Sequence, residues 1–299
     1  MEIRELTLEA FAKAFPTLPC VFCSAQFNAL NASKASGLKA MAMFDGSTPV
    51  CGQIFGLRED MWEAPFSAPY SLPSGILQPD FYEKVAESVS EPLELIWPSP
   101  IYTDITHPEG TVISEDVNFH YPLSKFANYE ANLTRRARNH HRNALKHPFQ
   151  LAKTENIAEA YAVFEYNHRV LGYRLAMSLQ QVLDTVKIIP AEFFTLSLEG
   201  TVVAAAMLYN TAPGIMQVIN WADLPEYRAN QSMQALAYLL FQHYANERPD
   251  IHTIDLGPAS VDGVRNEGLC KFKASLGALP TPKFTIRIRD ERREMRKER

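Results

Sequence analysis

The chain has 299 residues, of which 46% are hydrophobic and 21% are charged, a composition typical of a folded protein and unlike that of a disordered one. This length predicts about two domains. Acidic residues outnumber basic ones by 34 to 29, which argues against binding nucleic acid or anionic membranes over the whole surface. No apolar run approaches the roughly 20 residues that span a bilayer, and the acidic N-terminus is unlike a secretory signal. With four cysteines, we expect reduced thiols and a cytoplasmic protein.

The first half of the chain predicts a helix, a hairpin and further short elements. Apolar residues at helical spacing predict an opening helix over 3–15. The apolar runs 37–44 and 50–57 flank the turn sequence DGSTP and predict a hairpin. Three prolines exclude a regular element at 63–75. The remaining predicted elements are a helix over 80–88 and strands over 93–97 and 117–121.

The second half of the chain follows a similar order. Apolar runs at 192–198 and 202–210 flank Glu199-Gly200 and predict a second hairpin. In both halves the hairpin precedes a strand, a polar or proline-bearing turn, a helix and a strand that ends in a proline-containing turn. The hairpin residues Gly46 and Gly200 lie 154 positions apart, so we predict an internal duplication. The other predicted elements are helices over 156–173, 178–186, 232–245 and 266–276, and strands over 215–221, 251–256 and 284–288.

These elements predict an α+β fold of two similar lobes, each a mixed, mostly antiparallel sheet flanked by helices. The predicted boundaries are 1–122 for the first lobe, 123–148 for a basic linking helix, 149–288 for the second lobe and 289–299 for a charged tail. The tail has six basic and four acidic residues and is typical of a frayed or disordered segment.

The linking helix carries a stripe of positive charge. No acidic residue occurs between Glu130 and Glu155, and four basic residues recur at intervals of three or four positions, which places them on one helix face. The stripe is either an ordinary solvated face or a patch that neutralises an anionic ligand, such as a phosphorylated cofactor, RNA or a cell-wall precursor. Its members are Arg135, Arg138, Arg142 and Lys146.

Several common sequence motifs of metal sites and active sites are incomplete or absent. Cys20 and Cys23 form a CxxC pair in an apolar context, but no second pair provides a zinc site, so we interpret them as core thiols and expect no metal. The sequence lacks a phosphate-loop motif, a dinucleotide fingerprint, a nucleophile elbow and a metalloprotease helix.

The loop before the predicted helix 232–245 offers an anion site. Backbone N–H groups at a helix start, together with the helix dipole, attract negative charge. Arg228 adds a positive side chain there, and Asn230 and Ser232 either help to bind the anion or only cap the helix.

The order of elements in 192–278 and the spacing of Asn266, Lys273 and Gly277-Ala278 resemble the GNAT acyltransferase superfamily. The segments FKASLGA and RRARNHHRNA are similar to the branch that includes the Fem-type peptidoglycan-bridge transferases and their acyl-CoA-using relatives. That branch has two fused GNAT-like lobes, which fits the predicted duplication. The architecture resembles the family over most of the chain, whereas the specific motifs cover only about 130–147 and 192–278.

The resemblance implies a donor site in the second lobe. In the family, the strands that match 215–221 and 251–256 diverge and hold the pantetheine arm of the donor. The implied co-substrate is acyl-CoA, with aminoacyl-tRNA as the second choice. A backbone N–H near Asn220 would polarise the thioester carbonyl, and the diphosphate would bind at the start of helix 232–245. The residues thereby assigned to cofactor binding are Asn220, Trp221, Ala222, Arg228, Asn230, Gln231, Ser232 and Asn266.

Two residues are candidates for catalysis. Lys273 replaces the tyrosine that often acts as general acid in GNAT enzymes and would stabilise negative charge on the donor or on the tetrahedral oxygen, with a surface lysine as the alternative. Asp255 is the candidate base, with a structural role in the turn as the alternative. The chain departs from the family in the loop Arg228–Met233, which lacks the glycines of the usual phosphate loop.

The sequence therefore predicts an N-acyltransferase that transfers an acyl group to an amine by direct attack. The expected acceptor is a small molecule or a cell-wall or lipid precursor, and RNA is a partner only if the donor is aminoacyl-tRNA. One alternative is a non-catalytic binding protein with the same fold that has lost donor binding. Another is an RNA-binding module that uses the basic stripe.

Overall fold

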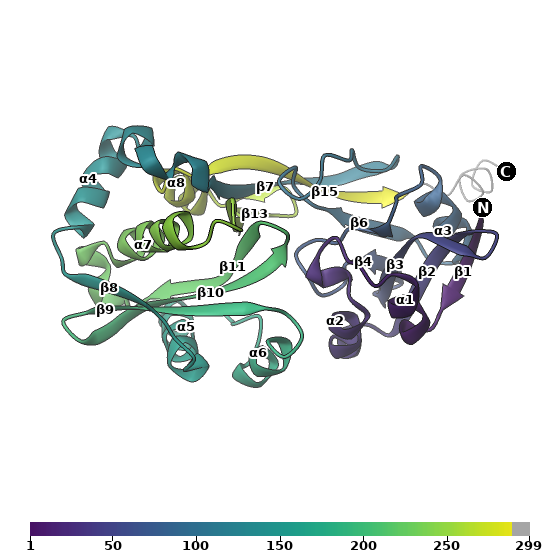
Figure 1. Cartoon of the computed structure of the whole chain (residues 1–299), viewed down its shortest axis with the longest axis horizontal. Coiled ribbons are helices and arrows are strands. Elements are labelled where there is room, and N and C mark those ends of the chain that lie inside the picture. Colours follow the sequence, from purple (N-terminus) through teal and green to yellow (C-terminus); the bar gives the residue numbers. More distant parts are fainter. Residues whose placement is uncertain (289–299) are drawn as a thin grey trace. The chain divides into compact units, whose positions relative to one another are not determined.

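The computed structural model describes residues 1–288 and divides them into two compact units. The first unit contains residues 1–117, 260–264 and 281–288, and the second contains 118–259 and 265–280. The predicted α+β fold of two lobes is confirmed, with a mixed sheet and flanking helices in each unit (Figure 1). The lobe boundaries at 122 and 148 stay predictions, and the charged tail 289–299 lies outside the described residues.

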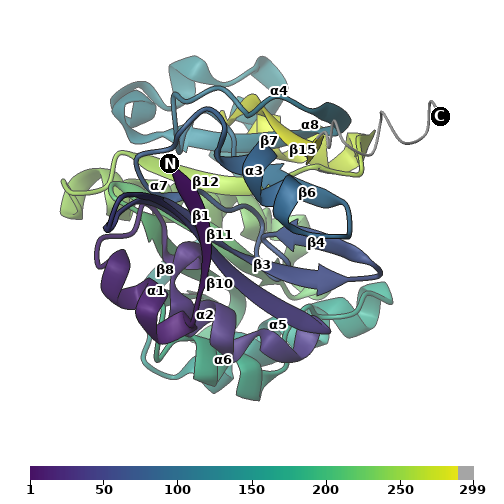
Figure 2. The same ribbon diagram turned by 90° about the vertical axis from the view of Figure 1, so that its right-hand side faces the viewer.

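The sheet of the first unit has the strand order β1-β2-β3-β4-β6-β15, and β4 and β6 form its parallel pair. Gly52 faces Phe11 of α1 and Phe15 just after it, whereas the adjacent Gln53 bonds to Tyr82 of α3, so α1 and α3 cover opposite faces (Figure 2). The elements of this unit are β1 (Glu2–Leu6), α1 (Leu8–Ala14), α2 (Ala25–Leu30), β2 (Gly37–Asp45), β3 (Thr48–Arg58), β4 (Met61–Ala64), β5 (Ser74–Gly75), α3 (Phe81–Ser88), β6 (Leu93–Trp97) and the short β13 (Ser260–Val261).

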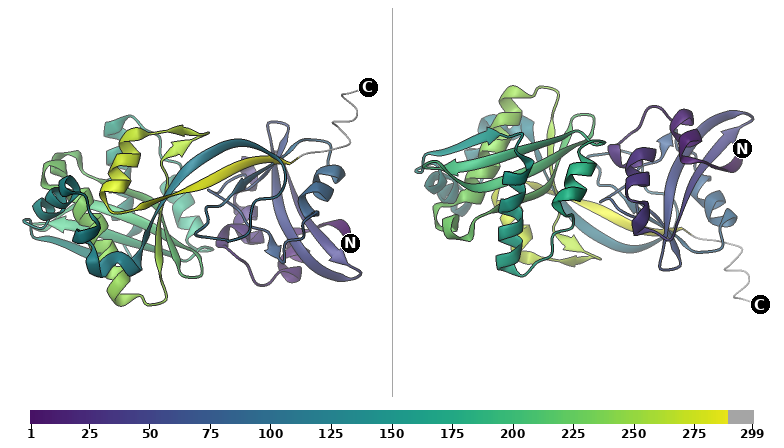
Figure 3. Two further views of the ribbon diagram at one scale, coloured as in Figure 1. Left: turned by 90° about the horizontal axis from the view of Figure 1, so that it is seen from above. Right: turned by 90° about the horizontal axis from the view of Figure 1, so that it is seen from below.

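The sheet of the second unit has the strand order β8-β9-β10-β11-β12-β7, and β11 and β12 form its parallel pair. Helix α7 covers one face, while α5 and α6 lie side by side on the other (Figures 1 and 3). Its elements are α4 (Arg135–Ala144), β8 (Phe149–Lys153), α5 (Ile157–Leu171), α6 (Leu179–Thr185), β9 (Ala191–Leu198), β10 (Thr201–Ala212), β11 (Ile215–Asp223), α7 (Ser232–Glu247), β12 (Thr253–Pro258) and α8 (Glu267–Ser275).

Three strands contain residues of both units. They are β7 (Thr111–Pro122), β14 (Val264–Arg265) and β15 (Leu279–Ile288). The end of β7 pairs with β12 of the second unit, and the end of β15 pairs with β6 of the first unit. Each sheet therefore contains a strand from the other half of the sequence.

The opening helix predicted over 3–15 is wrong for its first residues. Residues Glu2–Leu6 form the edge strand β1, antiparallel to β2, and Glu5 forms an ion pair with Lys39 of that strand. The helix begins only after Thr7, whose side chain accepts a hydrogen bond from the Ala10 backbone N–H. Pairing with a strand some 40 residues away thus overrides the helical spacing of the apolar residues.

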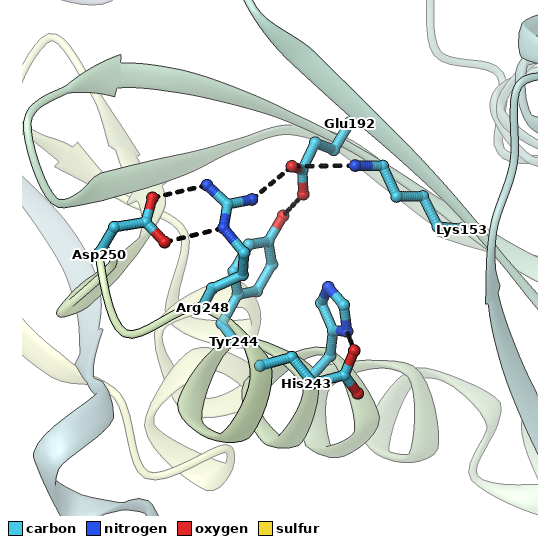
Figure 4. Close-up of polar contacts among 7 residues, drawn as sticks. Lys153, Glu192, His243, Tyr244, Arg248 and Asp250 are labelled. Atoms are coloured by element: carbon cyan, nitrogen blue, oxygen red, sulfur yellow. Dashed lines mark hydrogen bonds and ion pairs between the residues drawn. The ribbon is translucent and has the colours of Figure 1, made fainter.

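The C-terminal end of α7 is fixed to the sheet by a polar network (Figure 4). Tyr244 Oη donates to Glu192 of β9 at 2.7 Å, and Lys153 of β8 forms an ion pair with the same carboxylate at 3.1 Å. Arg248 joins Glu192 to Asp250. Burial raises the pKa of Glu192, but these partners outweigh burial and lower it overall, so the carboxylate stays charged. The network positions α7 on β8 and β9.

Candidate functional site

The parallel strands of the second unit pair over only three positions. Ile215 pairs with Thr253, Met216 with Ile254 and Gln217 with Asp255, after which no further pair joins β11 to β12. On its other side, β11 shifts register against β10 between Val218 and Asn220. Such a bulge bends a strand and increases its twist, which favours separation from β12. This is the divergence that the family resemblance implies, and we call it the β11–β12 opening.

The predicted donor residues Asn220, Trp221 and Ala222 lie on β11 beyond the last paired position. Ala222 is buried, and the other two side chains are half-buried. The Trp221 ring meets Phe272 of α8 edge to face, with 6.0 Å between the ring centroids. The structure therefore brings an aromatic pair to this stretch of β11.

The start of α7 holds a carboxylate of the chain itself. Asp223 is 3% exposed and accepts hydrogen bonds from Arg228 Nε at 3.1 Å and from Ser232 Oγ at 2.7 Å. Both predicted anion-binding side chains are thus bound to an internal anion at the positive end of the helix dipole. Sequence reasoning missed Asp223, whose position at the end of a strand just before the loop was the available signal.

The other predicted loop residues turn toward α4 and the chain that follows it. Gln231 Oε1 lies 2.8 Å from His140 Nδ1, and Asn230 Nδ2 lies 3.4 Å from the His147 ring. Gln231 adopts a left-handed conformation with φ of 62°, at the place where the family usually has a glycine. Their predicted roles in donor binding stay predictions.

Most of the predicted basic stripe is bound to nearby groups. Arg138 donates to the carbonyls of Glu130 and Leu133, and Arg142 forms an ion pair with the Glu130 carboxylate at 2.8 Å. A hydrogen bond from Arg142 lowers the pKa of Glu130. Lys146 donates to Asn143, so within residues 1–288 Arg135 alone among the four has no polar partner.

A pocket of about 580 Å³ lies against another face of α4. Arg136 and Lys271 line it, and neither forms a hydrogen bond or ion pair with any residue in 1–288. None of the described residues that line it is acidic, so the pocket is cationic, and we call it the α4–α8 pocket. Sequence reasoning noted Arg136 only as an added donor beside the stripe and missed Lys271, which lies on another helix. Its lining residues are Thr134, Arg136, Ala137, His140, Gln234, Gly268, Lys271, Phe272, Ala274 and Ser275.

Lys273 is buried, so the surface-lysine alternative is wrong. It is 3% exposed, and its Nζ donates to the carbonyls of Leu256, Gly257 and Pro258 at 2.7–2.8 Å. These three bonds use every N–H of the ammonium group. Burial lowers the pKa of Lys273 to about 8, although the negative charge of Asp255 opposes the shift. Lys273 fixes the end of β12 and places a positive charge beside the opening.

Asp255 is the centre of a buried hydrogen-bond network. It is 1% exposed and accepts from Asn118 Nδ2 at 2.8 Å, Gln217 Nε2 at 2.9 Å and the Gly257 backbone N–H at 2.9 Å. The bond to a backbone two residues ahead is the structural turn contact that we considered as an alternative. Its assignment as the base stays a prediction. The polar Gln217 in the otherwise apolar start of β11 was a signal that sequence reasoning missed.

Asn266 caps α8, since its Oδ1 accepts from the Leu269 backbone N–H at 3.0 Å. Its predicted role in cofactor binding stays a prediction. Residues 1–288 contain no group of three histidine, cysteine or acidic side chains placed to hold a metal ion. Among the same residues, no helix has the length and apolar character needed to cross a membrane. Cys20 and Cys23 are buried, with their sulfurs 2.9 Å apart.

Comparison with known proteins identifies the class of fold. No family model matches the sequence. No curated protein matches it significantly. FemX has a TM-score of 0.64 to this chain at 12% identity, with 100% of both chains covered. L-PGS from Bacillus licheniformis has a TM-score of 0.57 at 15% identity, covering 95% of this chain and 91% of its own.

A tandem GNAT protein from the clavulanic acid biosynthesis pathway has a TM-score of 0.51 at 10% identity, covering 96% of this chain and 98% of its own. The chain thus has a duplicated GNAT-like fold that resembles Fem-type proteins, as the sequence predicted. At these identities the likeness concerns the fold, and any activity must be argued from the site.

Proposed function

We propose that the second unit is an N-acyltransferase site that binds the arm of an acyl carrier in the β11–β12 opening. The observation that carries the proposal is that the parallel strands stop pairing after Gln217 and Asp255. Backbone groups beyond this position are available to hydrogen-bond an extended arm, as an added strand would. The duplicated GNAT-like fold supports the same reading.

The anionic part of the carrier binds in the α4–α8 pocket. Arg136 and Lys271 are without partners in residues 1–288, whereas the start of α7 already holds the Asp223 carboxylate. A second anion beside Asp223 would meet like charge, which disfavours the diphosphate position that the resemblance implies. Phe272 lines the pocket and also contacts Trp221 of β11, so it connects the pocket to the opening. Phosphates of acyl-CoA or of aminoacyl-tRNA would fit this pocket.

The reaction is direct attack of an amine on the acyl carbonyl carbon. The positive charge of Lys273 favours the negative charge that develops on the carbonyl oxygen, and a β11 backbone N–H near Asn220 would act in the same direction. Because Lys273 already donates three hydrogen bonds, we assign it as a positioning residue that acts through the end of β12 and through its charge. A small amine, or an amine of a cell-wall or lipid precursor, is the proposed acceptor, and the proposed location is the cytoplasm.

A second candidate is a binding protein that has the fold but does not transfer. Two observations favour it: the Asp223 carboxylate at the start of α7 and the Trp221–Phe272 ring contact. This candidate requires that the pocket binds an anion without presenting a thioester or ester to an amine.

The test measures acyl transfer from acetyl-CoA, longer acyl-CoAs and a mixture of aminoacyl-tRNAs to a panel of amines. We expect one donor class to support transfer, and we expect the Arg136→Ala/Lys271→Ala double variant to raise the KM for that donor about tenfold or more. The control is Arg135→Ala, a neighbouring arginine outside the pocket that also has no polar partner within residues 1–288. Donor binding without transfer would support the second candidate, a binding protein. The absence of both donor binding and transfer would contradict the proposed transferase.

A further inference from the structure

A row of polar side chains crosses the second sheet at the last paired position of β11 and β12. His120 of β7 pairs with Asp255, Asp255 with Gln217, and Gln217 with Tyr209 of β10. Residues paired directly across strands project to the same face, so all four side chains share one face. The neighbouring Tyr121 stacks on Phe241 of α7, which places the row on the face away from that helix. We call these four residues the polar row.

The row contains three buried polar atoms that have no hydrogen-bond partner among residues 1–288: His120 Nδ1, Gln217 Oε1 and Tyr209 Oη. Gln217 and Tyr209 are only 3% and 2% exposed. An unsatisfied buried polar atom is costly, and three of them gathered in one row call for a functional explanation. Gln217 Oε1 is an acceptor, His120 Nδ1 is an acceptor when the ring is neutral, and the Tyr209 hydroxyl can accept or donate. The row is therefore suited to bind a group that carries N–H protons.

The first unit shows that the fold does not require polar residues at this position. There, β4 and β6 also pair over three positions, and their last pair is Ala64 with Leu95. Ile286 of β15 is the next residue across, in the place that His120 occupies in the second unit. All three are apolar and at most 1% exposed. The same architecture therefore packs well with an apolar row, and the polar row is a particular property of the second unit.

His120 is the member of the row best placed to accept a proton. Its Nδ1 is buried and has no hydrogen-bond partner within residues 1–288. When the neutral ring carries its proton on Nε2, Nδ1 presents a free lone pair. Burial lowers the pKa of His120, and the positive charge of Lys125 lowers it further. The negative charge of Asp255 opposes this shift but does not cancel it, so the ring is neutral at pH 7.

The geometry points to the polar row as the amine subsite of the proposed transferase, with His120 Nδ1 as the proton acceptor. The inference rests on the proposed function, because an arm held in the β11–β12 opening ends where the strands pair, at Gln217 and Asp255. The amine nitrogen forms a bond to the acyl carbon, and the bond from that carbon to the carrier sulfur or oxygen breaks with its electron pair. The amine proton moves to His120 and then to the departing carrier. Gln217 and Tyr209 orient the amine.

The first experiment compares matched variants in a transfer assay with the donor that the wild type uses and glycinamide as the acceptor. We expect His120→Asn to lower kcat/KM at least a hundredfold and to abolish the loss of activity that protonation of His120 causes at acid pH, below the ordinary histidine range. Tyr209→Phe removes an unpartnered hydroxyl of the row and should lower kcat/KM about tenfold. The control is Tyr121→Phe, which removes another buried, unpartnered hydroxyl from the opposite face and should leave kcat/KM within twofold. Thermal unfolding confirms that each variant is folded.

The second experiment does not depend on activity. The ¹⁵N resonance of the His120 ring is followed as glycinamide is added, and we expect Nδ1 to shift in the wild type and the response to weaken in Tyr209→Phe. If the wild type transfers acyl groups but His120→Asn retains activity within threefold, the inference is wrong while the proposed function stands. If the wild type transfers no acyl group, the proposed function fails. If the ¹⁵N resonance of Nδ1 does not shift when glycinamide is added, the amine subsite is wrong as well.

Discussion

The two units contain the same opening between parallel strands and fill it differently. In the first unit the loop after β4 returns, and the Ser71 backbone N–H donates to the Ile96 carbonyl of β6 at 3.4 Å, with Tyr70 and Leu72 buried beside it. In the second unit, no loop backbone in residues 1–288 bonds to the carbonyls of 256–258, and Lys273 takes them instead. The two units thus share an architecture, and within residues 1–288 loop backbone bonds to the second parallel strand at this place in the first unit but not in the second.

The largest expected effect comes from making the second unit resemble the first. Asp255→Leu introduces the residue that the first unit has at Leu95 and leaves three buried donors without their acceptor. We expect a loss of about 4 kcal/mol in the free energy of unfolding and no detectable transfer. Urea unfolding and the transfer assay measure the two effects.

Adding Gln217→Ala to Asp255→Leu should recover about 1 kcal/mol, because one stranded donor is removed, but it should not restore transfer. Transfer in the double variant would contradict the difference between the two units that we describe.

The next effect concerns the charge on Lys273. Its pKa is lowered from 10.5 to about 8, so between these values the unfolded chain binds more protons than the folded one. The folding penalty of the buried charge is therefore present at neutral pH and is relieved as the pH rises. Relative to Lys273→Met, the wild type should gain about 2 kcal/mol in unfolding free energy between pH 7.5 and 9.5.

The activity of the wild type should change in the opposite direction and fall above about pH 8, since the positive charge beside the opening is lost. Chemical denaturation and kcat/KM measured over the same pH range test both directions. Equal pH profiles for the wild type and Lys273→Met would contradict the role assigned to the Lys273 charge. Lys273→Arg keeps that charge and should therefore retain activity at pH 9.

A smaller effect is expected at the aromatic pair of the opening. Trp221→Ala removes the ring that contacts Phe272 and should weaken donor binding about tenfold, or about 1.4 kcal/mol. The matched change in the first unit is Leu72→Val in the returning loop, which should cost about 1 kcal/mol of stability and leave donor binding unchanged. Calorimetric titration with the active donor compares the donor affinity of the two variants with that of the wild type. Tighter donor binding by Trp221→Ala would show that the Trp221 ring closes the opening.

The smallest effect is expected at the opposite end of α7. Tyr244→Phe removes the hydrogen bond to Glu192 and should cost about 1 kcal/mol of stability. Because this residue lies roughly 18 Å along the helix from Ser232, transfer should be unchanged. A loss of transfer would mean that the position of the whole helix matters to the site.

Local patterns predicted the fold well, and contacts between distant segments limited the prediction of the site. Both hairpins and the strand β6 follow from apolar runs and turn residues. The edge strand β1 was missed because its pairing with β2 is long-range. The role of Arg142 depends on Glu130, which a pair of short 3-10 turns brings back to the helix. The polar row was not visible because it depends on the register of four strands.

The strands that end in the other unit have a consequence for synthesis on the ribosome. The first unit needs 281–288 to pair with β6, so its sheet has an unprotected edge until these residues, which follow the whole second unit, have been translated. Its early synthesis therefore gives it no head start in folding. Fragments cut at residue 122 or 148 would each leave β6 without its neighbour, and the two halves would have to associate to complete their sheets.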